Sequence, residues 1–309
     1  MHSAVLLYNP LSGNHQEKRR QQIDAVREVL RNARVETECF ATRSGPDATA
    51  QARQAVAAGY DTVFACGGDG TINDVLQGLV GTQTALAVIP MGTANSLAHD
   101  LGLPIHPTRA LRAALSGVLR RIAVGKIEYQ DLAGNPAARY FTVTAGIGVD
   151  ALLFRKLDPL TKRHLGMVSY YAKATYLWLT YKMKEFSVEF VDAAGTKSVC
   201  ADVTQLLAVR IRNFGGILRE LAPGASLDRE DVRLVLFRTK NRLAYLQYVI
   251  RGMLNTNWKV EGIESAYSGQ VICGPSNSQI FVEVDGELLG TLPGKISIVA
   301  NAVSVLTPK

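Results

Sequence analysis

The sequence has 309 residues, of which 47% are hydrophobic and 20% charged, a balance that excludes a disordered chain and allows two hydrophobic cores. The net charge of +7 favours anionic partners such as nucleotides, nucleic acid or acidic membranes. Four widely spaced cysteines without a C-x-x-C pair, and no uncharged apolar run near about 18 residues, argue against a disulfide scaffold and a membrane-spanning helix. We expect a cytoplasmic protein that contacts membranes only at their surface.

Short apolar runs alternate with helical patterns in the first third of the chain. Strands are predicted at 4–8, 35–41, 61–66 and 85–90, and helices at 16–34, 46–59 and 71–81. This alternation indicates a parallel sheet with helices on both faces. Ligands of such sheets bind at the carboxyl ends of the strands, so the loops that follow the strands are the first candidates for a site.

The loop CGGDGT follows the third predicted strand. Gly67, Gly68 and Gly70 let an anion approach the backbone, and a helix opened by Thr71 adds a favourable field. Phosphates would repel Asp69 without a cation, so holding Mg²⁺ through water, or positioning a hydroxyl nucleophile, explains it. A tight turn in which Asp69 caps its helix is an equal alternative for this cluster taken alone.

Two further loops have similar chemistry. YNPLSGNHQ, after the first strand, carries Asn9, Ser12 and Gly13, which could reach a nucleotide, although its spacing matches neither common phosphate-binding fingerprint. Gly92 and Thr93 follow the fourth strand within PMGTANSLAHDLGLP, just before a predicted helix. Three such loops at neighbouring strand ends together predict a nucleotide site.

The sequence pattern changes after about residue 122, where runs rich in β-branched residues alternate with turn residues. They predict a β domain, a sandwich, that packs closely on the first domain with a cleft between the two. Helical patterns interrupt it at 157–184 and 241–255. The predicted strands are 140–149, 186–191, 203–211, 232–237, 269–274, 279–284 and 295–306.

The motifs YNPLSGN, GGDGTINDV and IPMGTANSLAHDLGLP, followed by TAGIGVDA, KRHLGMVSYYAKATYLW and VDGELLG, resemble the diacylglycerol kinase catalytic-domain family. This family includes bacterial lipid kinases, diacylglycerol kinases and sphingosine kinases, and the likeness covers nearly the whole chain. It implies an ATP-binding α/β domain at 1–123, related to those of NAD kinases and phosphofructokinases. A β-sandwich lipid domain at 124–296 and a last strand at 297–309 that returns to the first domain are implied as well.

The resemblance also implies roles for individual residues. Glu287 stands where the bacterial members have a general base, and a carboxylate can accept the proton of a poorly nucleophilic lipid hydroxyl. Asp69 is the second catalytic residue and the one that contacts Mg²⁺. Without the resemblance, EVDGELL is only a β-hairpin with an Asp-Gly turn, and Asp285 either orients Glu287 or touches the nucleotide. The residues implied for ATP are Asn9, Ser12, Thr42, Gly67, Gly68, Asp69, Gly70, Thr71, Asn73, Gly92, Thr93 and Asp285.

The chain departs from the family pattern in two places. Ser96 follows the asparagine of GTAN, where the family often has aspartate, as also happens in sphingosine kinase-like members. An ungapped match puts Arg229 on an aspartate that ligates a structural Mg²⁺ in bacterial members, and a guanidinium cannot ligate a cation. We therefore expect that metal to be absent and Arg229 to occupy its place, paired with Asp228 or Asp231. A slipped register with Asp228 as the ligand is the alternative.

Tyr170, Ala174, Leu177 and Tyr181 form an apolar stripe at helical spacing, flanked by lysines. Such a helix can lie on an anionic bilayer, although packing on a sheet is the commoner use.

The sequence thus predicts an ATP- and Mg²⁺-dependent lipid kinase of phospholipid metabolism that phosphorylates a hydroxyl of a glycerolipid such as diacylglycerol, or of a related amphiphile. Two alternatives stay open: an NAD kinase-like enzyme with a soluble acceptor, and a catalytically inactive lipid- or nucleotide-binding protein. The expected partners are the lipid substrate and the membrane surface. Nucleic acid is not expected, because the basic residues are scattered, and exposed β edges leave a homodimer open.

Overall fold

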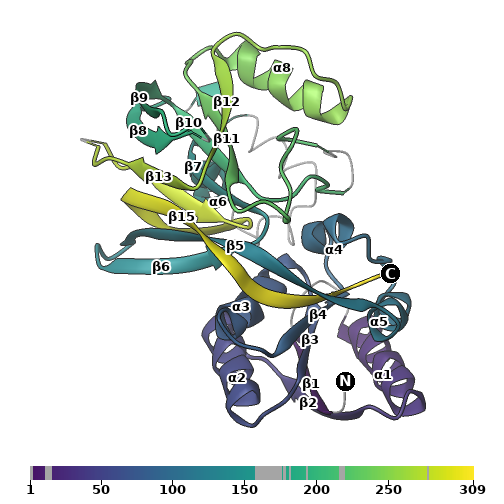
Figure 1. Cartoon of the computed structure of the whole chain (residues 1–309). Helices are drawn as coiled ribbons and strands as arrows, with labels where there is room; N and C mark the ends of the chain where they lie inside the picture. The colour runs from purple at the N-terminus through teal and green to yellow at the C-terminus, as the bar shows by residue number, and fades with distance from the viewer. Residues whose placement is uncertain are drawn as a thin grey trace. The chain divides into compact units, whose positions relative to one another are not determined.

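The structure is a computed structural model that describes residues 3–10, 16–156, 176, 179–180, 182–192, 194–215, 220–276 and 278–309 (Figure 1). The chain divides into two compact units. Unit 1 comprises Met1–Val124, Asn213–Gly216 and Val299–Lys309, and unit 2 comprises Gly125–Arg212 and Ile217–Ile298. No helix within the described ranges is long and apolar enough to cross a membrane.

Unit 1 contains a parallel sheet in the order β4-β3-β1-β2, with the end of β15 added beside β4. The two central strands β3 and β4 are buried along their whole length, as expected for a sheet covered on both faces. The strands are β1 (Ser3–Tyr8), β2 (Glu36–Ala41), β3 (Thr62–Gly67) and β4 (Ala85–Pro90). All four lie within about two residues of their predicted positions.

The helices of unit 1 cover the two faces of this sheet, with α2 and α3 on one side and α1 and α5 on the other (Figure 1). Leu30 of α1 and Leu111 of α5 share one hydrophobic cluster with Phe64 of the central strand β3. α3 begins at Asp69, two residues before its predicted start, because the glycine-rich stretch itself forms the first helical turn. The helices are α1 (Gln16–Asn32), α2 (Gly45–Ala57), α3 (Asp69–Leu79), α4 (Ser96–Asp100) and α5 (Pro107–Leu115).

Unit 2 is rich in strands, and two groups of them share the long strand β15. One group runs β12-β11-β10-β7-β14-β15, and the other links β9, β8, β13, β15, β5 and β6. One hydrophobic cluster contains Leu234 from the first group and Val188 from the second, so the groups face each other across a common core. The predicted fold class, an α/β unit joined to a β-sandwich, is confirmed.

The bounds of the elements of unit 2 follow the chain, with β5 and β15 each running on into unit 1. The strands are β5 (Val118–Asp131), β6 (Pro136–Phe141), β7 (Thr144–Gly148), β8 (Phe186–Val191), β9 (Lys197–Val203), β10 (Gln205–Val209), β11 (Val232–Phe237), β12 (Ile263–Ser268), β13 (Gln270–Cys273), β14 (Phe281–Val284) and β15 (Glu287–Thr307). The helices are α6 (Val149–Lys156) and α8 (Arg242–Met253).

Two predictions in this part of the chain need correction or lie outside the described residues, and several elements were not predicted. The strand predicted at 140–149 is broken between β6 and β7, because the backbone amides of Thr142, Val143 and Thr144 all donate to the carboxylate of Asp285. β5, β9, β12, α6 and most of β6 were not predicted. The helix predicted at 157–184, with its apolar stripe, lies mostly outside the described residues.

Candidate functional site

The loops that follow β1, β2, β3 and β4 start from one edge of the sheet of unit 1. The register pairs Tyr8 with both Ala41 and Cys66, and Gly67 with Pro90, so the four strands end side by side. Since the strands are parallel, all four loops begin at their carboxyl ends, where ligands of such sheets bind.

Asp69 joins two of these loops. It is the first residue of α3, and its Oδ1 accepts a hydrogen bond from the backbone amide of Ser96 at 2.7 Å. Burial raises the pKa of Asp69, and hydrogen bonds from the amides of Ser96, Asn95 and Leu97 oppose that rise. The carboxylate therefore caps the start of the neighbouring helix α4, and it holds the GTANS loop against the GGDGT loop.

The two glycine loops touch through their backbones. A Cβ atom on Gly92 would lie 2.5 Å from Cα of Gly68, a separation that no real side chain shows. Asn95, which the sequence analysis did not single out, shapes this loop from a left-handed backbone with φ of 52°. Its Oδ1 accepts from the Gly92 amide at 2.8 Å, and its Nδ2 donates to the Gly92 carbonyl at 3.0 Å. Thr93, which follows Gly92, is exposed.

Thr42 and Asn9, two other residues predicted to bind the nucleotide, lie at the ends of β1 and β2. Thr42 is buried and ties β2 to β1, since its amide donates to the Tyr8 carbonyl at 2.8 Å and its hydroxyl at 3.3 Å. Asn9 follows directly after Tyr8 at the same edge and is half-buried. Ser12 lies outside the described residues.

Thr71 and Asn73 are directed into the protein. Thr71 is buried and packs back on Gly67, where an added Cβ would meet its side chain. Asn73 is also buried in α3, and its Oδ1 accepts from Nε2 of Gln77 at 3.1 Å. Gly67, Gly68, Asp69, Gly70, Gly92 and Thr93 thus form the front of the candidate site, with Thr71 and Asn73 behind it.

Arg19 of α1 is a site residue that the sequence analysis missed. Its side chain is buried, its Nη2 donates to the Met91 carbonyl at 2.8 Å, and its Nη1 has no acceptor within the part of the chain that the structure describes. Burial lowers the pKa of this guanidinium. Arg19 follows the apolar spacing of Ile23, Val26 and Leu30 along α1, and an arginine on that stripe is the signal that could have identified it.

A cavity of about 630 Å³ opens beside Arg19 at the ends of β1 and β2. Three arginines and one aspartate give it a net positive lining, which suits an anionic ligand. Its lining residues are Tyr8, Pro10, Arg19, Arg20, Ile23, Asp24, Arg27 and Cys39.

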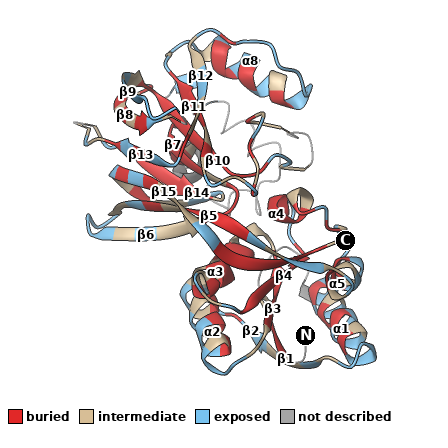
Figure 2. Ribbon diagram, in the orientation of Figure 1, coloured by how far each residue is buried: buried red, intermediate tan, exposed pale blue. Residues whose placement is uncertain are grey.

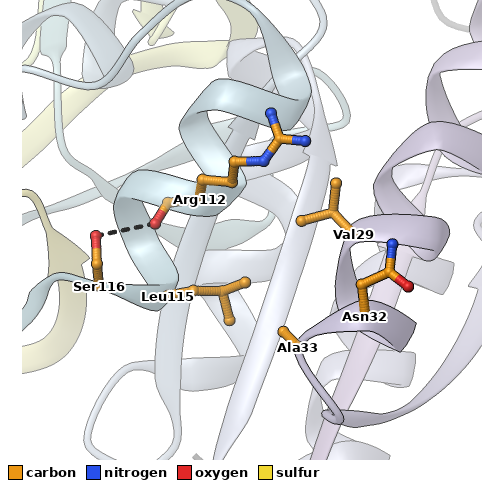
Figure 3. Close-up of a pocket in the computed structure, with 6 residues that line it drawn as sticks. All are labelled: Val29, Asn32, Ala33, Arg112, Leu115 and Ser116. Atoms are coloured by element: carbon orange, nitrogen blue, oxygen red, sulfur yellow. Dashed lines mark hydrogen bonds between the residues drawn. The ribbon is translucent and has the colours of Figure 1, made fainter.

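A second cavity of about 390 Å³ lies between the carboxyl ends of α1 and α5 (Figure 3). It is lined by Val29, Asn32, Ala33, Arg112, Leu115 and Ser116, and the Ser116 hydroxyl donates to the Arg112 carbonyl at 3.0 Å. It has no carboxylate and no glycine loop, and it lies at the end of α1 remote from the loops described above. We assign no ligand to it.

In unit 2, Asp285 and Gly286 form a two-residue turn between β14 and β15, with φ of 48° and 86°. The Asp285 carboxylate accepts from the amides of Val143 at 3.1 Å and Thr144 at 2.9 Å, so it fixes the turn to the backbone before β7. Its contact with a nucleotide stays a prediction. Glu287 begins β15 with a side chain that is 46% exposed, and it accepts from Nη2 of Arg139 at 3.2 Å.

Two further acidic residues, which were not predicted from the sequence, lie behind this turn. Glu283 is buried in β14, and its Oε2 accepts from the Gly286 amide at 2.9 Å. A side chain on Gly146 would collide with both Glu283 and Asp150, so the two carboxyl groups meet over that glycine. Burial raises the pKa of Asp150 to about 7, and burial together with the charge of Asp150 raises that of Glu283.

Arg229 makes a two-point ion pair with Asp231, with both N–O distances at 2.6 Å, and stacks on Tyr267. The fully buried Arg210, another residue that sequence analysis missed, donates to the carbonyls of Arg229 at 2.8 Å, Leu227 at 3.2 Å and Asp231. A buried guanidinium thus gathers the carbonyl groups of this loop. The absence of a structural metal here stays a prediction.

Residues 3–127 match the model of the diacylglycerol kinase catalytic domain. A diacylglycerol kinase of Bacillus subtilis is 28% identical and covers 100% of this chain and 97% of its own length. One of Staphylococcus saprophyticus is 29% identical, with 99% and 95% covered.

Solved structures show the same fold. A diacylglycerol kinase of Bacillus anthracis matches 99% of this chain and 97% of its own with a TM-score of 0.72 at 17% identity. Yeast NADH kinase in complex with NADH matches 100% of this chain and 84% of its own with a TM-score of 0.51 at 9% identity. Residues 3–127 are therefore similar to the diacylglycerol kinase catalytic domain, and the chain as a whole is similar to bacterial diacylglycerol kinases, as its motifs predicted.

Proposed function

We propose that this enzyme is a lipid kinase that transfers the γ-phosphate of ATP to a hydroxyl of a glycerolipid such as diacylglycerol, with Mg²⁺ as cofactor. The observation that carries the proposal is the link made by Asp69, whose carboxylate holds two glycine loops together at the carboxyl edge of a parallel sheet. The curated relatives, named diacylglycerol kinases, supply the class of acceptor. ATP as the donor implies that the reaction occurs on the cytoplasmic side.

The loop edge of unit 1 fits a polyphosphate. Because neither Gly68 nor Gly92 has a side chain, the two loops pack together, and a phosphate can approach the N-terminus of α3 beside them. The buried Nη1 of Arg19, without an acceptor among the described atoms, can donate to a phosphate oxygen. Mg²⁺ held near Asp69 would neutralise phosphate charge and favour the ionised form of a carboxyl group whose pKa is raised.

Glu287 is the proposed general base. It is exposed enough to meet an acceptor, and the guanidinium of Arg139 orients its carboxylate. The turn that carries it is fixed from behind by Asp285 and by Glu283, which receives the Gly286 amide. A carboxylate held in this way can accept the proton of the lipid hydroxyl as that oxygen attacks the γ-phosphate.

The test is transfer of labelled γ-phosphate from ATP into a total lipid extract in mixed micelles, with NAD offered in a parallel reaction. We expect a labelled glycerolipid, and loss of label by at least about 10²-fold in Asp69→Asn and Glu287→Gln. Glu264→Gln is the matched control and should keep the wild-type rate. It changes a carboxylate on β12 that pairs with Arg238.

Label in NAD instead of lipid would favour the soluble-acceptor alternative. If ATP binds but no acceptor is labelled, the protein is a binding protein that has lost catalysis. Either result would overturn the lipid kinase proposal.

A further inference from the structure

An exposed apolar surface covers the outer side of α8 and the turn that follows it. We call it the α8 face, and its members are Leu243, Leu246, Val249, Ile250, Met253, Leu254 and Trp258. Each of these side chains is between 38% and 62% exposed. Figure 2 shows buried and exposed stretches alternating along the same helix. Apolar side chains gathered on one face in this way mark an interaction site.

The opposite side of α8 is firmly packed, so the helix does not need the α8 face for its own folding. Tyr245 and Tyr248 are buried and lie 4.6 Å and 5.0 Å from Phe237 between ring centres. The Tyr245 hydroxyl bonds the Thr204 hydroxyl at 2.7 Å, and Asn241 caps the first turn by accepting from the Leu243 amide at 2.9 Å. The helix is a rigid support for its exposed apolar side chains.

The charges of this segment indicate what covers the face. Residues 240–260 include four basic residues and no aspartate or glutamate. Lys240 pairs with Glu185 and Arg251 lies over the ring of the buried Tyr248, so Arg242 and Lys259 are the cations considered for the α8 face. Basic residues beside leucine, isoleucine and tryptophan are the composition of a helix that lies in the interface of an anionic bilayer. In a symmetric pair of copies joined through this face, each set of cations would approach an identical set, which disfavours self-association.

We propose that the α8 face docks the protein on the surface of an anionic bilayer. The apolar side chains enter the boundary between headgroups and acyl chains, and Arg242 and Lys259 contact acidic headgroups. The proposal rests on the proposed function only in that a lipid acceptor gives the enzyme a reason to be there.

The test measures binding to sedimented vesicles directly, without catalysis. Vesicles of phosphatidylglycerol and phosphatidylcholine are compared with pure phosphatidylcholine, using wild type and the double variant Leu246→Glu/Ile250→Glu. We expect wild type to bind the anionic vesicles and the double variant to bind at least about 10-fold less. The reason is that charged groups replace apolar side chains that would enter the bilayer. Leu132→Glu, at a side chain 60% exposed in the turn after β5, is the matched control and should bind like wild type.

One further measurement, of kinase activity, keeps this proposal separate from the previous one. Kinase activity on a short-chain diacylglycerol in micelles should be retained by the double variant, which also shows that it is folded. Vesicle binding by wild type through the α8 face, without any lipid kinase activity, would reject the proposed function and support the docking surface.

Equal vesicle binding by wild type and the double variant would overturn the docking surface. If in addition wild type sediments as a dimer and the double variant as a monomer, the α8 face is an interface between copies of the chain.

Discussion

At the scale of single residues, the contact between Gly68 and Gly92 is a tight constraint on the proposed phosphate site. Gly92→Ala would place a methyl group 2.5 Å from Cα of Gly68 and 2.9 Å from Oδ1 of Asn95. The loops must separate, so we expect kcat/KM for ATP to fall by about 10²-fold. Gly269→Ala is the control, because its Cβ would meet nothing nearer than the Glu230 carbonyl at 4.0 Å. Equal kinetics of the two variants would refute this role.

The acidic pair behind the Asp285–Gly286 turn makes stability depend on pH. The pKa of Asp150 is about 7 in the folded protein against 3.8 for the ordinary group, and that of Glu283 is raised as well. The folded state therefore binds more protons than the unfolded chain, and the free energy of unfolding falls as the pH rises from about 4 to about 7. Asp150→Asn should show a shallower fall in urea titrations across this range. An unchanged slope would show that Asp150 does not titrate there.

Arg210 and Arg229 allow the contribution of a buried guanidinium to stability to be compared with that of a partly exposed one. Arg210→Met leaves the carbonyls of Leu227, Arg229 and Asp231 without this donor, so we expect a loss of about 3 kcal/mol in the free energy of unfolding. Arg229→Met removes an ion pair whose arginine is 40% exposed and should cost less than about 1 kcal/mol. The reverse order in urea denaturation would contradict this assignment.

The same contacts bear on the structural metal. Because the Arg210 guanidinium already gathers these carbonyl groups, chelation of divalent cations should leave the unfolding of the nucleotide-free protein unchanged. A lower midpoint in the presence of a chelator would show that a metal binds the fold after all.

At the scale of elements, the stability of α8 depends on its cap as well as on its two tyrosines. Asn241→Ala removes the acceptor of the Leu243 amide and should cost about 1 kcal/mol of unfolding free energy, measured in urea. Asn32→Ala, at the exposed last residue of α1, changes no such cap and is the control. If both substitutions cost the same, the Asn241 hydrogen bond does not stabilise the helix.

The elements predicted correctly are those with a strong local signal. β3 and β4 are short apolar runs, and the paired signals of Pro46 and Gly59 delimit α2. β9 was missed because its side chains are mostly exposed or half-exposed, so its sequence lacks an apolar run. β5 was missed in a similar way, since charged residues such as Arg120, Lys126 and Glu128 interrupt it and its pairing with β6 and β15 decides its structure.

The site was predictable where its residues lie together in one loop. Asp69 and the glycines around it share a stretch of a few residues. Arg19 is recognised as a site residue only through its hydrogen bond to the carbonyl of Met91, 72 residues away. Glu283 and Asp150 likewise meet only through the pairing of β14 with β7. A single sequence does not show such contacts, because they depend on which strands become neighbours.

At the scale of the whole molecule, the two units carry different parts of the proposed chemistry. Unit 1 carries the glycine loops, Asp69 and Arg19, and unit 2 carries Glu287 on a turn fixed by Asp285 and Glu283. This division predicts that nucleotide binding and transfer respond differently to substitutions in the two units.

The most direct test is a single-turnover transfer of γ-phosphate from ATP to diacylglycerol, with ATP binding measured on the same samples. We expect Glu287→Gln to bind ATP as wild type does and to transfer the phosphate at least about 10²-fold more slowly. Arg139→Met should show a smaller loss in the transfer rate, because it removes only the group that orients the base. Transfer by Glu287→Gln at the wild-type rate would contradict the central claim that this carboxylate is the base of a lipid kinase.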